Sequence, residues 1–192
     1  MGSPTVVSAV SLHKEKLKSD FLLIIDGPRH PSNKPTLTFG ARGISRITLT
    51  SFGPIKPQHS GHFGNYAPNP AMNLSKILSS MKDYDGRVVI PGFYDGVTFS
   101  DEIKLVMDAV PDDEDQIKKE LMVASADKVG ENYQEAIQYP SLNVRGLQSG
   151  WVRKEVRTIV PDMAIAEIDV RLVKESNPER LLNLIKNHII KE

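Results

Sequence analysis

The sequence predicts an α+β fold in which an antiparallel sheet carries helices on one face. Residues 44–52 and 164–172 alternate between apolar and polar side chains, which is typical of strands with one buried face. Two Asn-Pro pairs, each followed by apolar residues at helical spacing, predict a helix in each half of the chain. These two strand–helix passages flank an acidic, irregular insertion at about residues 92–140.

The sequence predicts that the first 30 residues form a separate structural unit. Residues 5–18 have partial helical spacing, and the apolar run Phe21–Ile25 predicts a buried strand of a parallel sheet. The run ends at Asp26, and an acid at the carboxyl end of such a strand is a common place for a ligand. Gly and Pro residues then indicate a linker. We therefore divide the chain into residues 1–30 and 31–192.

The first passage begins with the strand at residues 44–52, where Ile47 and Leu49 share one face. Asn69 caps a helix that has proline at its first position, and Asp85-Gly86 ends it. Residues 88–90 predict a short strand. The buried stripe of the helix consists of Leu74, Ile77, Leu78 and Met81.

The insertion and the second passage follow. We expect helices at residues 112–123 and 132–137, and the acidic run at the start of the first suits a helix N-terminus better than a cation site. Residues 141–147 predict a strand. After the strand at 164–172, Asn177-Pro178 starts the last helix, whose buried stripe includes Leu181, Leu184, Ile185 and His188 or Ile189.

The composition excludes several classes of protein. The 192 residues include 24 basic and 24 acidic side chains, so no charge excess indicates nucleic acid or an anionic membrane as a partner. There is no cysteine for disulfides or thiolate metal sites, and no apolar run of about 20 residues that would span a bilayer. We expect a cytoplasmic protein.

Residues 56–70 form a polar, Gly-broken loop that carries His59 and His62. Such a loop on a rigid element, with a side chain that titrates near neutral pH, is a favoured place for chemistry. A loop histidine can also make only a local hydrogen bond. Arg171 suits a carboxylate ligand, but it could equally pair with Glu167 or Asp169 on its own strand.

Six short motifs, in this order along the chain, resemble the lid (dimerisation) domain of the carnosinase-like dizinc metallopeptidases, which include dipeptidases, aminoacylases and desuccinylases. The resemblance covers the chain from about Met1 to Asn187. The motifs are Gly40-Ala-Arg-Gly43, His59-Ser-Gly61 with Phe63-Gly64, Pro68-Asn-Pro70, Ile90-Pro-Gly-Phe93, Thr158-Ile-Val-Pro161 and Arg171-Leu-Val173.

The resemblance implies a ferredoxin-like lid at residues 31–192, inserted in a catalytic α/β domain of which residues 1–30 are a remnant. It implies a homodimer acting on dipeptides or N-acyl amino acids. His59 would stabilise the oxyanion in the partner subunit's site. Thr158 and Arg171 would bind substrate, with Arg171 also serving the partner's site. Asp26 would be a ligand of one of two zinc ions in a full-length parent, although an Asp before Gly-Pro is also an ordinary turn residue.

The remaining family motifs have no counterpart in this chain. They are the first His and Asp metal ligands, the Glu-Glu pair that contains the general base, and the last His ligand. The start Met1-Gly2-Ser3 resembles the segment that follows the Glu-Glu pair. We therefore expect this segment to bind no zinc and to be inactive alone. The alternative is a stand-alone, non-catalytic dimerising or binding module.

Overall fold

The computed structural model describes residues 4–23, 30, 32–36, 38 and 40–192. The chain divides into two compact units, Met1–Leu37 and Thr38–Glu192. Within the described residues, no helix has the length and apolar content needed to cross a membrane.

The N-terminal unit contains one short helix, α1 (Val6–Leu12), none of whose residues is buried. The predicted helix at 5–18 is therefore present but shorter. The predicted strand at residues 21–25 is wrong for residues 21–23, which form no strand and in which Phe21 is 92% exposed. An apolar run becomes a strand only when neighbours pair with its backbone and cover its side chains, and the described part of this unit does neither. Residues 24–26 lie outside the described residues.

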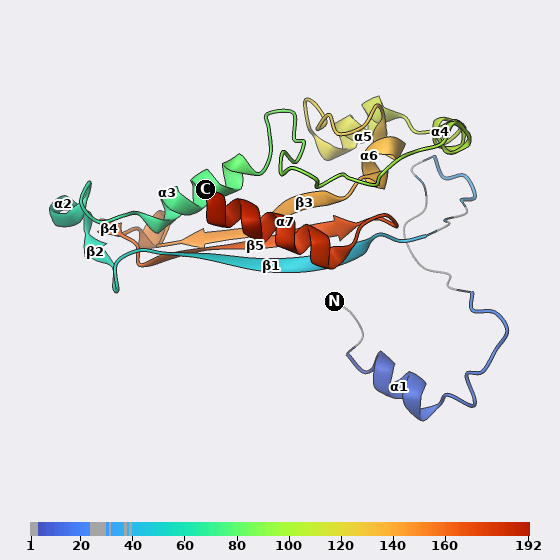
Figure 1. Ribbon diagram of the computed structural model, residues 1–192, viewed down its shortest axis with the longest axis horizontal. Coiled ribbons are helices and arrows are strands. Elements are labelled where there is room, and N and C mark those ends of the chain that lie inside the picture. Colours follow the sequence, from blue (N-terminus) through green and yellow to red (C-terminus); the bar gives the residue numbers. More distant parts are fainter. Residues whose placement is uncertain (1–3, 24–29, 31, 37, 39) are drawn as a thin grey trace. The chain divides into compact units, whose positions relative to one another are not determined.

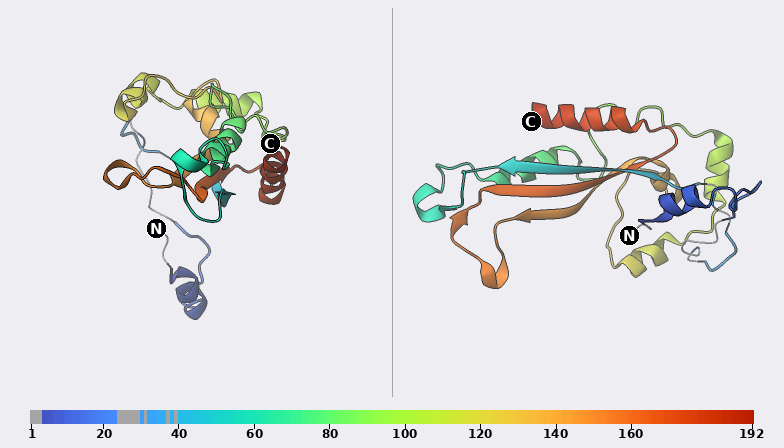
Figure 2. Two further views of the ribbon diagram at one scale, coloured as in Figure 1. Left: turned by 90° about the vertical axis from the view of Figure 1, so that its left-hand side faces the viewer. Right: turned by 90° about the horizontal axis from the view of Figure 1, so that it is seen from below.

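The second unit is built on a three-stranded antiparallel sheet in the order β1-β5-β3. Its strands are β1 (Gly43–Phe52), β5 (Met163–Leu172) and β3 (Ser141–Ser149). Figure 2 shows the three strands side by side from below. A separate two-residue ladder joins β2 (Gln58–His59) to β4 (Ile159–Val160) beyond one end of this sheet (Figure 1).

Helices α3 (Pro70–Ser80) and α7 (Pro178–Lys191) lie on the same face of the sheet (Figure 1). Asn69 and Asn177 cap them through their side-chain oxygens, as predicted. The core contains inward residues of both helices, the even-numbered residues of β5, one residue of β3 and four residues after α3. They are Leu74, Leu181, Ile185, Ala164, Ala166, Ile168, Val170, Leu142, Met81, Val88, Ile90 and Phe93. The predicted antiparallel sheet with helices on one face is thus confirmed.

The insertion lies at the end of the sheet where β5 finishes (Figure 1) and contains α4 (Asp101–Asp108), α5 (Glu114–Leu121) and α6 (Tyr133–Gln138). Helices were predicted near α5 and α6 but not at α4. The predicted strand at residues 88–90 is wrong, because Val88 makes only an isolated bridge to Lys82. The Val88 N–H donates to the Tyr94 hydroxyl at 2.9 Å, so the side chain of Tyr94 uses a backbone group that a further ladder would need.

Candidate functional site

His59 lies at a junction between the short strand β2 and the single helical turn α2 (Ser60–Phe63). Its Nδ1 accepts a hydrogen bond from the Gly61 N–H at 3.0 Å and so caps that turn. Because a neutral imidazole has one donor and one acceptor, this bond places the ring proton on Nε2. The His59 and His62 rings pack in an edge-to-face arrangement, with 4.9 Å between centroids. Among the described residues none hydrogen-bonds to Nε2, so the local fold leaves this N–H of His59 available as a donor.

Thr158 lies next to this loop although it is about 100 residues away in the sequence. The Ser60 N–H donates to the Thr158 carbonyl at 3.1 Å, and His59 is the ladder partner of Ile159. Two of the predicted site residues are thus brought together at one end of the sheet.

This end of the molecule, which we call the His59 end, exposes many large apolar side chains. Ile55 is 98% exposed, and both loops that meet at the β2–β4 ladder contribute others. Many exposed large apolar side chains at one end of a molecule are typical of an interaction site. The exposed apolar residues of this end are Phe52 at the end of β1 and, in the loops, Ile55, Phe63, Tyr66, Trp151, Val152 and Val156.

Arg171 lies near the opposite end of β5, eight residues after Met163. A strand rises by about 3.3 Å per residue, so roughly 25 Å separates the two positions along β5. Within one copy, Arg171 is therefore not brought to His59 and Thr158. The carboxylates that could have paired with it are taken by Arg145, whose Nη2 lies 3.0 Å from Glu167 Oε2 and whose Nε lies 3.3 Å from Asp169 Oδ1. The second contact is an ion pair without hydrogen-bond geometry, because Asp169 Oδ1 accepts no hydrogen bond.

The metal-binding prediction falls on Asp26, which lies outside the described residues. Among the residues that the structure does describe, no group of three or more His, Asp or Glu side chains could hold a metal ion. A catalytic zinc takes three protein ligands. The described part of the chain therefore does not fit a resident zinc ion.

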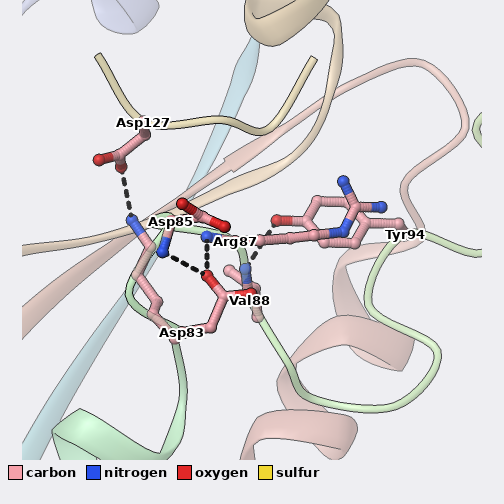
Figure 3. Close-up of polar contacts among 7 residues, drawn as sticks. Asp83, Asp85, Arg87, Val88, Tyr94 and Asp127 are labelled. Atoms are coloured by element: carbon pink, nitrogen blue, oxygen red, sulfur yellow. Dashed lines mark hydrogen bonds and ion pairs between the residues drawn. The ribbon is translucent and has the colours of Figure 1, made fainter. Parts of the chain in front are cut away.

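The sequence did not reveal a polar cluster that holds the insertion against the end of α3 (Figure 3). Asp83 Oδ1 accepts hydrogen bonds from the backbone N–H groups of Asp85 and Arg87, at 3.0 and 2.9 Å. The Arg87 guanidinium lies 4.5 Å from the centre of the Tyr94 ring. Burial raises the pKa of the Tyr94 hydroxyl, although the bond from the Val88 N–H opposes that shift.

A cavity of about 260 Å³ lies beside this cluster, bordered by Lys82, Tyr94 and Asp127 among others. Lys82 closes part of its rim through an ion pair to Asp127 at 3.2 Å. The residues that line the cavity hold the insertion in place by packing and by this ion pair. They provide no nucleophile with an adjacent base. The short runs that build it, at residues 82–94 and 126–142, have no pattern by which sequence reasoning could have joined them.

Comparison with known proteins places this geometry in context. The profile of a family described as "Peptidase dimerisation domain" matches residues 39–192. The Cys-Gly metallodipeptidase dug1 of Schizosaccharomyces pombe is 27% identical, over 99% of this chain and 41% of the relative. Human beta-Ala-His dipeptidase is 26% identical, over 98% of this chain and 38% of the relative. The chain thus spans about two fifths of the length of these curated relatives.

Solved structures agree with the fold. An M20 family metallo-carboxypeptidase from Sulfolobus solfataricus, Sso-CP2, superposes with a TM-score of 0.78 at 30% identity, over 97% of this chain and 49% of that one. Human carnosine dipeptidase 1 superposes with a TM-score of 0.79 at 24% identity, over 99% of this chain and 41% of that one.

Proposed function

Because the chain belongs to the peptidase dimerisation domain family, we propose that it is the lid and dimerisation part of a zinc-dependent metallopeptidase. The parent enzyme hydrolyses the amide bond of dipeptides or N-acyl amino acids in the cytoplasm. The observation that carries the proposal is the His59 end, where a histidine with a free N–H donor stands among exposed apolar side chains.

His59 acts as a donor to the oxyanion that develops when water attacks the substrate carbonyl. That role needs an N–H fixed in place before the reaction begins. The bond from the Gly61 N–H to Nδ1 supports it in two ways, since it fixes the ring and keeps the proton on Nε2. The exposed apolar side chains around His59 bury against the catalytic part of the partner subunit and exclude water from the site.

Arg171 binds the substrate carboxylate, and Thr158 contacts the substrate beside His59. A dipeptide spans far less than the roughly 25 Å that separates the two ends of β5. In a symmetric dimer each active site therefore takes His59 and Thr158 from one copy and Arg171 from the other. This arrangement replaces the expectation that His59 and Arg171 both serve the partner's site.

The zinc ions and the general base belong to parts of the parent other than the described residues of this chain. Zinc, when bound there, supplies the activated water. The residues described here orient the substrate and stabilise charge. We therefore expect this chain alone to hydrolyse no dipeptide, with or without added zinc.

The dimer contact includes the helix-facing side of β3. Ile168 and Ala166 are fully buried there, but their ladder partners on β3, Val144 and Leu147, are 39% and 60% exposed. The core face of the sheet is thus left uncovered along this edge. A second copy related by a two-fold axis covers it and receives the same cover in return.

Subunit complementation tests the proposal. A polypeptide that joins this chain to its catalytic segment is made as two variants, His59→Ala and Arg171→Ala, each of which should be inactive as a homodimer. Random mixing makes half of the dimers mixed, and each mixed dimer has one complete site, so about a quarter of the wild-type activity should return. Absence of any recovery in mixed dimers would contradict the shared site. A chain that stays monomeric at high concentration would favour the stand-alone binding module.

A further inference from the structure

Two arginines share one corner of the sheet. Arg171 faces away from the helices, like the other odd-numbered residues of β5, and its ladder partner on β1 is Ile44. Arg42 immediately precedes β1 and lies two residues before Ile44, the spacing at which side chains of an extended chain share a face. The charge of the Arg171 guanidinium lowers the pKa of Arg42, so the two side chains lie within electrostatic range of each other. Tyr133 of α6 also lies within electrostatic reach of Arg42.

This corner differs from the middle of the same face. There, Arg145 lies between the carboxylates of Glu167 and Asp169, and Thr48 donates a further bond to Glu167. Among the described residues, neither Arg42 nor Arg171 forms an ion pair. Positive charge is thus balanced in the middle of the face and unbalanced at the corner.

The unbalanced charge has a physical consequence. Arg42 as a whole residue is exposed, but partial burial of its guanidinium is the largest cause of its lowered pKa, and the neighbouring guanidinium adds to it. An arginine cannot relieve such repulsion by losing its proton in the physiological range. An anion between the two groups would relieve it, and a guanidinium holds a carboxylate through two parallel bonds.

We propose that Arg42 and Arg171 form a two-arginine carboxylate site that favours ligands with two carboxylates. The assignment of that ligand rests on the proposed function: in the peptidase it is the C-terminal residue of the substrate, with one arginine on the main-chain carboxylate and the other on an acidic side chain. The parent enzyme then prefers Asp or Glu at that position. Arg42 is the specificity-determining residue, because a neutral C-terminal residue needs only Arg171.

The test uses the 192-residue chain and small probes. The Nε–H signals of arginine are followed by NMR while glutarate, a dicarboxylate, or acetate is added. Glutarate should shift the Arg42 and Arg171 signals together and bind about tenfold more tightly than acetate. Arg42→Gln should abolish that preference, and Arg42→Lys should restore only part of it because lysine lacks the planar fork.

Arg46→Gln is the matched control, since Arg46 lies on β1 two residues after Ile44, on the same face, but opposite Asp169 in the ladder. It should leave glutarate binding unchanged. Equal binding of glutarate and acetate, or equal loss of binding in the Arg46 and Arg42 variants, would overturn the proposal. The measurement is binding of glutarate to this chain alone, so its result is independent of peptidase activity. If complementation failed while glutarate still bound, the proposed peptidase function would be rejected and the two-arginine site would stand.

Discussion

Replacing Leu147 by lysine should weaken the proposed dimer without unfolding the protomer. Leu147 lies on the helix-facing side of β3, where its ladder partner Ala166 is fully buried while 60% of its own surface is exposed. In the proposed dimer the second copy covers that surface. The substitution would place a charge at this contact, where burial without a partner is unfavourable.

The structure gives the size of the effect. Full burial of a leucine side chain contributes about 1.5–3 kcal/mol, so covering the exposed part of Leu147 contributes about 1–2 kcal/mol. Because the dimer is two-fold symmetric, each copy makes this contribution and the total is twice as large. The dimer dissociation constant should therefore rise by roughly 30-fold to several hundred-fold. Sedimentation velocity across a concentration range measures it directly.

Gln148→Lys is the control, because Gln148 is the next residue on the same strand but faces away from the helices, opposite Ile165. It adds the same charge and should leave the dimer intact. Both variants should keep the wild-type circular dichroism spectrum, whereas only Leu147→Lys should lower the concentration-dependent melting temperature that dimerisation raises. A dimer that survives Leu147→Lys, or one that both variants weaken equally, would refute the assignment of this face.

Three further predictions concern stability. Ile168→Ala at the centre of β5 should lower the free energy of unfolding, measured in urea, by roughly 2–5 kcal/mol. Val152→Ala on the exposed loop should change it by less than about 0.5 kcal/mol. Similar effects of the two substitutions would contradict the described core. Asn177→Ala should lower the free energy of unfolding by about 1 kcal/mol because it removes the cap of α7. Asn177→Asp keeps a capping oxygen and should lower it much less. Burial raises the pKa of Tyr94, so the unfolded chain loses this proton at a lower pH than the folded chain, and the free energy of unfolding should fall as the pH rises above about 10. Burial raises the pKa of Tyr139 as well, so absorbance titration should show two late-titrating tyrosines, and Tyr94→Phe should remove one of them.

The parts of the fold that depend on local patterns were predictable from the sequence. The alternation of β5 identifies its buried face because side chains on a strand alternate strictly between two sides. Asn69-Pro70 and Asn177-Pro178 mark helix starts because the capping bond and the fixed proline backbone act within one turn. Helix α4 was missed although Ser100, followed by Asp101 and Glu102, is a recognisable start.

The rest depends on contacts between distant segments. Apolar character alone made residues 21–23 look like a buried strand, but burial requires neighbours, and the described residues of that unit supply none. The β2–β4 ladder has two residues on each strand, too few for a periodic signal. The motifs identified His59 and Arg171 as site residues, whereas Arg42 was noted only as part of the Gly40-Ala-Arg-Gly43 motif. His59 and Arg171 lie at opposite ends of the sheet, and this placement follows only from how strands distant in the sequence pair.

The outer edge of β1 has a consequence for assembly. Ten consecutive residues of β1 pair with β5 without a bulge, whereas β3 carries a register shift between Val144 and Gly146. In the described part of the chain no strand pairs with the outer side of β1. If copies met edge to edge there as well as along β3, each would have two self-complementary contacts, and the sheet would grow into a fibre without end. A finite dimer therefore requires that no second copy pairs with the outer edge of β1.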